Sequence, residues 1–137
     1  MPAVTAKDPT VRSGSGLIFR LGDPGFEARR SGFNLAVDHH PAVIVDAGSP
    51  ADVVSAVRLA AREGRPLGVM NTGHGPSVPA HGAVLVRTGR LRRVDVDRGR
   101  RTARVEGGAV WRDVSDAAAR HGLAPLNGSS PAVGVAG

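Results

Sequence analysis

The sequence predicts an α+β fold in which a parallel βαβ unit comes first and an antiparallel pair of strands follows. Two short apolar runs, 42–45 and 67–70, flank a segment at 50–63 whose apolar residues recur at helical spacing. A strand–helix–strand order over about 30 residues is typical of a right-handed βαβ unit with parallel strands. Residues 94–97 and 102–105 then read as two strands joined by the turn Arg98-Gly99-Arg100.

The N-terminal residues give weaker signals. Residues 1–16 are mostly small or polar, and we expect residues 1–22 to form a poorly ordered leader. Between residues 17 and 41 the apolar positions are scattered, which predicts irregular structure with one short helix near residues 26–30. We therefore place the folded domain at residues 23–137.

The helix over residues 50–63 has clear start and stop signals. Ser49 can cap its first turn, Pro50 suits the first helical position, and Asp52 can complete a capping box. Gly64 is a typical C-terminal stop. The run at 42–45 is rich in β-branched residues, which predicts a buried strand before this helix.

Residues 83–87 predict a third strand, and residues 110–120 predict a second helix that ends at Gly122. The tail over 126–137 is small, apolar and glycine-rich, and it carries no stop signal. We expect the chain to be truncated in the middle of a domain, after the start of a second sheet subdomain.

Composition excludes several classes of chemistry. The chain has 137 residues, enough for about one domain. It contains neither cysteine nor tyrosine, which excludes disulfides, cysteine-ligated metals, thiol nucleophiles and a tyrosine base. We expect no metal site. No apolar run reaches the ~18 residues of a membrane helix, and no secretory signal is present, so we expect a cytoplasmic protein without membrane contacts.

His74 is the strongest candidate for chemistry. It lies between Gly73 and Gly75, directly after the predicted strand at 67–70. Glycines let a backbone approach a ligand closely, and successive backbone N–H groups can form a nest for a pyrophosphate. From this spacing alone, a loop histidine bonded to a neighbour is the simpler interpretation, because a lone Gly-His-Gly is a weak signal.

A second glycine cluster, Gly128 to Gly137, supports the functional interpretation. Two such loops can hold one extended anionic ligand from two sides. Neither loop is a Walker sequence, and neither matches the G-x-G-x-x-G pattern of a Rossmann site.

Several motifs in register resemble one family from Asp23 onward. They are Phe33-Asn34, the strand Pro41–Val45, the helix Asp52–Gly64, the loop Thr72-Gly73-His74-Gly75, the stretches Thr102–Trp111 and His121-Gly122-Leu123, and the loop Gly128–Gly137. Together they resemble the FAD-binding domain of the p-cresol methylhydroxylase (PCMH) and vanillyl-alcohol oxidase superfamily, in its berberine-bridge-enzyme-like branch. The resemblance covers roughly residues 23–137.

This resemblance implies a PCMH-type FAD-binding fold and a flavin-dependent oxidoreductase. In the family, the histidine of the loop is joined to the 8α-methyl carbon of FAD, which implies a covalent link at His74. Many members have a second link from a cysteine, but Ser130 occupies that position here. A hydroxyl is a poor nucleophile without an activating base, so we expect a single link.

The resemblance also implies what lies around the cofactor. The substrate is expected to be a small molecule (an alcohol, a sugar or a secondary metabolite) bound by a C-terminal domain that this chain lacks, so we expect the chain alone to be inactive. The residues expected to hold FAD belong to the two glycine-rich loops. They are Asn71, Thr72, Gly73, His74, Gly75, Pro76, Ser77, Gly128, Ser129, Ser130, Val133, Gly134 and Gly137.

The arginine-rich stretch from Arg87 to Arg104 supports an alternative function as a basic, non-enzymatic nucleic-acid-binding module. Such a site needs its charges on one face, and single strands also need aromatic residues for stacking. Aromatic residues make up only 3% of the chain, and Asp95 and Asp97 interrupt the run. We therefore favour a solvated hairpin and no nucleic-acid partner. We expect His39, His40, His81 and His121 to have structural or surface roles.

Overall fold

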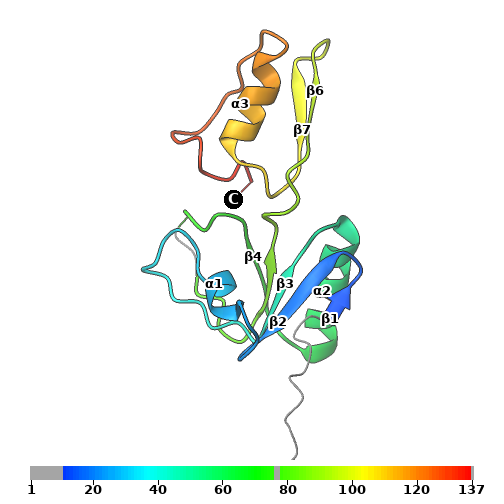
Figure 1. The fold of residues 1–137 in the computed structure, drawn as a ribbon, viewed down its shortest axis with the longest axis vertical. Helices are drawn as coiled ribbons and strands as arrows, with labels where there is room; N and C mark the ends of the chain where they lie inside the picture. Colours follow the sequence, from blue (N-terminus) through cyan, green and yellow to red (C-terminus); the bar gives the residue numbers. More distant parts are fainter. Residues whose placement is uncertain (1–10, 76–77, 137) are drawn as a thin grey trace, which may run out of the picture.

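The computed structural model describes residues 11–75 and 78–136, which form two parts (Figure 1). The first part is a five-stranded sheet with the strand order β1-β2-β3-β5-β4. Its strands are β1 (Val11–Ser13), β2 (Gly16–Arg20), β3 (Val43–Asp46), β4 (Leu67–Met70) and β5 (Val84–Arg87). The second part contains the antiparallel pair β6 (Val94–Asp97) and β7 (Thr102–Val105) and the helix α3 (Trp111–Ala119).

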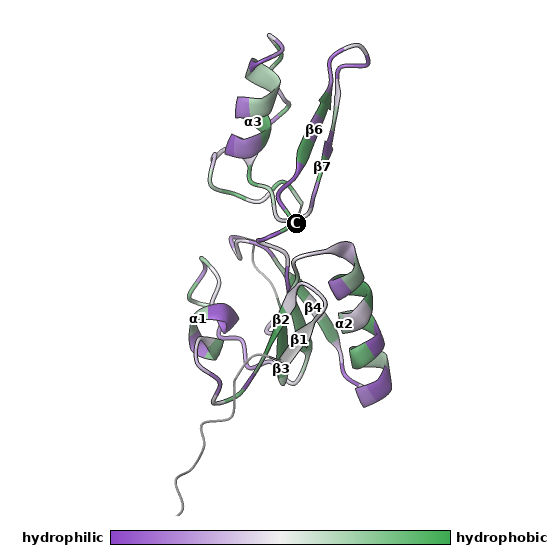
Figure 2. Cartoon of the chain, turned by 45° about the vertical axis from the view of Figure 1, so that its right-hand side comes forward, coloured by the Kyte–Doolittle hydropathy of each residue, from purple (hydrophilic) through white to green (hydrophobic). Residues whose placement is uncertain are grey.

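Two helices cover the two faces of the sheet. The apolar cluster under α2 (Pro50–Glu63) joins Ala56 and Ala60 to Val43 and Val45 of β3. The cluster under α1 (Phe26–Arg30) contains Ile44 of the same strand. Successive side chains of a strand point to opposite faces, so a strand that is apolar at every position is buried on both sides. Figure 2 shows this concentration of hydrophobic residues along the sheet strands.

The expected βαβ unit is confirmed, with one addition. Strands β3 and β4 are parallel members of one sheet, and α2 connects them. However, β5 lies between them and pairs with both. This order places β5, whose residues Val84, Leu85 and Val86 are buried, at a position with a neighbouring strand on each side. The short helix expected near residues 26–30 is also confirmed as α1.

The expectation of a poorly ordered leader over residues 1–22 needs correction. Residues 1–10 lie outside the described part of the chain, but β1 and β2 pair with each other, and β2 pairs antiparallel with β3. The physical reason is that Leu17-Ile18-Phe19 is a continuous apolar run. Leu17 and Phe19 contact the α1 cluster, and Ile18 contacts the α2 cluster. Burial on both faces makes this segment a strand of the sheet.

The start of α2 is tied to the turn between β1 and β2 through Asp52. The N-cap is formed as expected, since Ser49 Oγ accepts from the Asp52 N–H at 3.3 Å. The Asp52 carboxylate accepts from Ser15 Oγ and Ser49 Oγ, both at 2.8 Å, and from the Gly48 N–H at 3.0 Å. Burial alone would raise the pKa of Asp52, but these hydrogen bonds outweigh it and lower that pKa.

The second part is a hairpin with a helix packed beside it. Helix α3 matches the predicted helix at 110–120, and Arg92 Nη2 binds its Asp113 Oδ1 at 2.7 Å. In the turn between β6 and β7, the left-handed residue is Arg101, with φ 54°, and not Gly99. Among the described residues, no helix has both the length and the apolar character needed to cross a membrane.

Candidate functional site

A cavity of about 490 Å³ lies at the junction of the two parts. It lies beyond the carboxyl ends of β4 and β5, where Asn71 and Thr88 follow the strands. Ligands of open α/β sheets typically bind in the crevice at this edge. The lining residues come from both parts of the chain and are His39, Gly68, Val69, Met70, Asn71, Thr72, Gly73, His74, Gly75, Val78, Ala80, Leu85, Thr88, Gly107, Val133, Gly134 and Ala136.

The loop that carries His74 is held in place by the segment after α1. The Phe33 N–H donates to the Thr72 carbonyl, and the Asn34 N–H donates to the Gly73 carbonyl, both at 2.9 Å. Gly73 has φ 72°, and a Cβ built on it would lie 2.6 Å from the Cα of Gly32. This glycine is therefore required both by its left-handed backbone and by the close approach of the two segments.

His74 is half-buried and is held by two contacts. Its Nδ1 lies 2.8 Å from Thr72 Oγ1. Its ring stacks on Phe33, with the ring centroids 3.9 Å apart and an angle of 15° between the planes. The hydrogen bond fixes one edge of the imidazole and the stacking fixes its plane. A neutral imidazole oriented in this way can act as a nucleophile or a proton acceptor toward a ligand in the cavity.

Side chains of the sheet part reach backbone groups of the second part around the cavity. Asn71 Nδ2 donates to the Ala109 carbonyl at 3.3 Å, and Thr88 Oγ1 donates to the Gly107 carbonyl at 3.0 Å. The Gly134 N–H lies 3.4 Å from Thr72 Oγ1. These contacts bring the expected loop at 71–75 against the expected loop near residue 134.

The structure brings together only part of the predicted site. Five of the residues expected in the first loop, Asn71 to Gly75, line the cavity, as do Val133 and Gly134 of the second. Gly128, Ser129 and Ser130 are not among the lining residues. A Cβ on Gly128 would lie 2.9 Å from Trp111 Nε1, so this glycine serves packing against the indole. Pro76, Ser77 and Gly137 lie outside the described residues.

Several cavity residues carry no signal in the sequence. His39 is buried, with 5% of its surface exposed, and its Nδ1 accepts from the Ala80 N–H at 3.1 Å. Burial lowers its pKa. The neighbouring histidine, His40, is exposed and lies 2.9 Å from Asp38 Oδ2. Adjacent histidines gave no indication of which one faces the interior. No group of three or more potential metal-ligating side chains occurs within residues 11–75 and 78–136.

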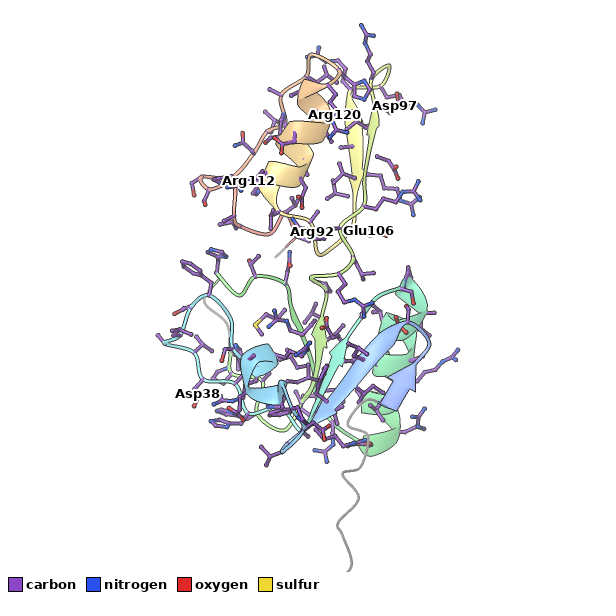
Figure 3. All side chains as sticks on the ribbon, in the orientation of Figure 1. Asp38, Arg92, Asp97, Glu106, Arg112 and Arg120 are labelled. Atoms are coloured by element: carbon purple, nitrogen blue, oxygen red, sulfur yellow. The ribbon has the colours of Figure 1, made fainter. Side chains whose placement is uncertain are left out.

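Most of the arginine-rich stretch has partners within the fold. Arg87 donates to the carbonyls of Arg29 and Ser31. Arg90 donates to the carbonyls of Ser15 and Asp46. Arg92, Arg93 and Arg100 form ion pairs with Asp113, Asp95 and Asp97. Figure 3 places the labelled Arg92 near the junction of the two parts and Asp97 at the far end of the hairpin. These five arginines therefore make contacts within the fold.

Comparison with known proteins gives a consistent result. The family described as FAD binding domain matches residues 41–137. The chain is 29% identical to (R)-6-hydroxynicotine oxidase of Paenarthrobacter nicotinovorans over 136 residues, which cover 98% of this chain and 30% of that protein. It is 34% identical to the FAD-linked oxidoreductase hasG of Aspergillus fumigatus over 99 residues, which cover 71% of this chain and 21% of that protein.

Solved structures show the same similarity. The crystal structure of 6-hydroxy-D-nicotine oxidase from Arthrobacter nicotinovorans has a TM-score of 0.82 and 28% identity, covering 89% of this chain and 27% of that one. Aclacinomycin oxidoreductase has a TM-score of 0.76 and 27% identity, covering 88% of this chain and 25% of that one. The chain thus spans less than a third of the length of these relatives.

Proposed function

This chain belongs to the FAD-binding domain family, and on that premise we propose that it forms the N-terminal, FAD-binding part of a flavin-dependent oxidoreductase. The observation that carries the proposal is the cavity at the junction of the two parts. Loop residues 71–75 and Val133-Gly134 meet there, with His74 on the wall. The relatives named above are oxidases or oxidoreductases.

The residues around the cavity fit an extended dinucleotide. Gly75 and Gly107 line it, and a Cβ built on either would meet no atom within 4 Å. Open space beside a glycine lets a ligand approach the backbone closely. The formal charge of +6 also favours an anionic ligand. When bound, FAD supplies the group that accepts a hydride from the substrate, while the loops hold and orient it.

We further propose that His74 forms a covalent link to FAD. The link would join an imidazole nitrogen of His74 to the 8α carbon, in place of one C–H bond of the methyl group and the imidazole N–H bond. The two protons and two electrons released would be accepted by the flavin, and a two-electron acceptor such as dioxygen would restore its oxidised state. Ser130, at the position of the second link in related proteins, is not a lining residue of the cavity, which supports a single link.

The substrate is proposed to be a small molecule, such as an alcohol, a sugar or a secondary metabolite. Because the relatives are more than three times as long as the matched region, we propose that other parts of the full protein bind this substrate. The chain described here supplies the cofactor site, and by itself it is expected to be inactive on substrate.

Mass spectrometry of the His74 peptide tests this function directly. The chain is incubated with FAD, precipitated with acid and digested. We expect a mass increase equal to one FAD less two hydrogens on the peptide that contains His74. H74N should lose this adduct and keep the yellow colour of non-covalently bound flavin. H81N is the matched control, because His81 is an exposed histidine just downstream and does not line the cavity.

The possible outcomes separate the parts of the proposal. Bound flavin without an adduct would contradict only the covalent role of His74. An adduct that persists in H74N would place the link at another residue. A colourless protein in every case, with neither bound nor attached flavin, would contradict FAD binding at this cavity.

A further inference from the structure

The part of the cavity wall that contains Ala80 is also held by the segment after α1. This segment pairs with Thr72 and Gly73 through Phe33 and Asn34, as described above. Eight residues beyond Thr72 in the chain, Ala80 meets the same segment a second time, through His39. The His40 carbonyl then accepts from the Gly82 N–H at 2.8 Å. One segment, residues 33–40, therefore contacts the cavity-lining stretch at two places, at residues 72–73 and at Ala80.

The contact between His39 and Ala80 depends on the protonation state of the imidazole. The Ala80 N–H can donate only to an unprotonated Nδ1, so the bond requires the neutral ring with its proton on Nε2. Both His39 and Ala80 line the cavity. Loss of the bond would leave the Ala80 N–H without its partner in a partly buried position. This would shift the equilibrium between the closed and the opened wall about tenfold toward the opened wall.

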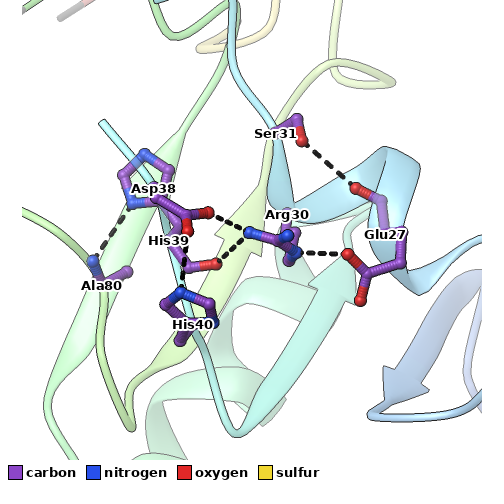
Figure 4. A network of polar contacts seen from close by, with 7 residues as sticks. All are labelled: Glu27, Arg30, Ser31, Asp38, His39, His40 and Ala80. Carbon is purple, nitrogen blue, oxygen red and sulfur yellow. Dashed lines mark hydrogen bonds and ion pairs between the residues drawn. The ribbon is translucent and has the colours of Figure 1, made fainter. Parts of the chain in front are cut away.

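The backbone of His39 is fixed independently of its ring (Figure 4). Arg30 Nη1 donates to the His39 carbonyl at 3.0 Å. The same guanidinium binds Glu27 Oε2 at 2.6 Å and also contacts the Asp38 carboxylate. This network connects α1 to the segment before β3. A change at the His39 side chain therefore acts on Ala80, while the position of His39 itself is retained.

We propose that His39 is a positioning residue of the cofactor cavity, holding Ala80 and the adjoining wall in place through its neutral imidazole. This role goes beyond the proposed function, and it rests on that function only for its consequence for flavin binding. Because the ring must be neutral, the wall is held at neutral pH and released as His39 becomes protonated.

The surroundings of His39 define the direction of the pH effect. Burial lowers its pKa from the ordinary value of 6.5. Among its charged neighbours, Asp38 raises the pKa, whereas His81, Arg30 and Arg87 lower it. The contact is therefore complete above pH 6.5 and is lost as the pH falls through the lowered pKa.

The test measures hydrogen exchange of the Ala80 amide by NMR, expressed as protection relative to the intrinsic rate. In the wild-type chain we expect the protection of Ala80 to fall about tenfold when the pH is lowered from about 7.5 to a value at which the ring-proton chemical shifts of His39 show a protonated imidazole. H39N should keep the protection of Ala80 constant. The asparagine Oδ1 is attached to Cγ, as Nδ1 is in histidine, so it can accept the same hydrogen bond, and it does not titrate. H39L should show low protection at both pH values.

H40N is the matched control, since His40 is the exposed neighbour, and it should behave like the wild type. FAD binding is measured on the same samples. We expect H39L to weaken FAD binding about tenfold at neutral pH, while H39N and H40N stay close to the wild type. The wild-type pH series needs no substitution, so the test holds even if H39L does not fold.

Ala80 protection that is independent of pH in the wild type, or equal in H39L and H39N, would overturn the proposal. Equal FAD affinity in H39L and the wild type would overturn its consequence for the cofactor. If Ala80 protection follows His39 as expected but no variant binds FAD, the proposed function fails, and the positioning of the cavity wall by His39 stands.

Discussion

Two adjacent glycines, Gly107 and Gly108, lie between β7 and α3, close to the segment that follows β5, and they have different structural roles. A Cβ on Gly108 would lie 1.9 Å from the Thr88 carbonyl oxygen and 2.7 Å from that of Leu91. A Cβ on Gly107 would meet nothing within 4 Å. Neither residue has a positive φ. Gly108 is therefore required only because the backbone of residues 88–91 lies so close to it. At this short distance the Gly108 N–H donates to the Leu91 carbonyl at 2.7 Å.

Gly108→Ala is expected to destabilise the chain by about 2–4 kcal/mol, because backbone atoms must move to admit the methyl group. Gly107→Ala is the matched control, with an expected change within about 0.5 kcal/mol. Urea unfolding followed by circular dichroism measures both. Equal stabilities of the two variants would show that the junction shifts at no cost, contrary to this account.

Residue types directed attention to one loop of the candidate site, because a histidine between glycines is visible in the sequence. His74 and its loop are of this kind, and the structure places them on the cavity. In the second loop, glycine spacing alone does not distinguish a packing role from ligand contact. Gly128 packs on Trp111, whereas Gly134 faces Asn71. His39 could not be found, because its role arises from a contact with Ala80, 41 residues away.

At the scale of elements, the start of α2 depends on one buried carboxylate. Asp52 is 1% exposed and links the helix to Ser15 and Gly48. Its pKa is lowered from 3.8 by hydrogen bonds that outweigh burial. The unfolded chain therefore takes up a proton at this site at higher pH than the folded chain. The stabilising contribution is complete above about pH 4 and decreases as the pH falls through the lowered pKa.

Asp52→Asn is expected to lower the free energy of unfolding by about 1–3 kcal/mol at pH 7. The amide NH2 group would face the hydrogen-bond donors Ser15, Gly48 and Ser49, which need an acceptor. The difference from the wild type should shrink below pH 4, as the wild type loses its charge. Asp116→Asn, on an exposed position of α3, should change little at either pH. Chemical unfolding at pH 7 and pH 3 measures this, and a constant difference would contradict the linkage.

Elements with local signals were predicted closely. The cap at Ser49 and the stop at Gly64 placed α2 at its observed bounds, and the alternation at 94–97 and 102–105 gave the hairpin β6–β7. Strand β2 was missed because Leu17-Ile18-Phe19 follows a polar stretch, and its partner β3 begins more than twenty residues later. The insertion of β5 between β3 and β4 is likewise a long-range pairing, which no local pattern specifies.

At the scale of the whole molecule, the two parts have separate apolar clusters. Both large clusters lie in the sheet part, while Val114 and Ala118 of α3 are buried in the second part. Polar contacts such as those of Asn71 and Thr88 connect the parts around the cavity. A ligand bound there touches both parts, so it stabilises the arrangement as a unit, by an amount set by its concentration relative to its Kd.

Thr88→Val tests this coupling, because it removes the hydroxyl that donates to the Gly107 carbonyl and retains the side-chain shape. Trp111 is the only tryptophan and lies in the second part, so its fluorescence reports on that part, while far-ultraviolet circular dichroism reports on the whole chain. The two thermal transitions should coincide in the wild type. In Thr88→Val the fluorescence transition should occur several degrees lower, for a loss of about 1–2 kcal/mol.

Thr102→Val, at an exposed position of β7, should leave the transitions coincident. Coincident transitions at an unchanged temperature in Thr88→Val would mean that other contacts hold the two parts together.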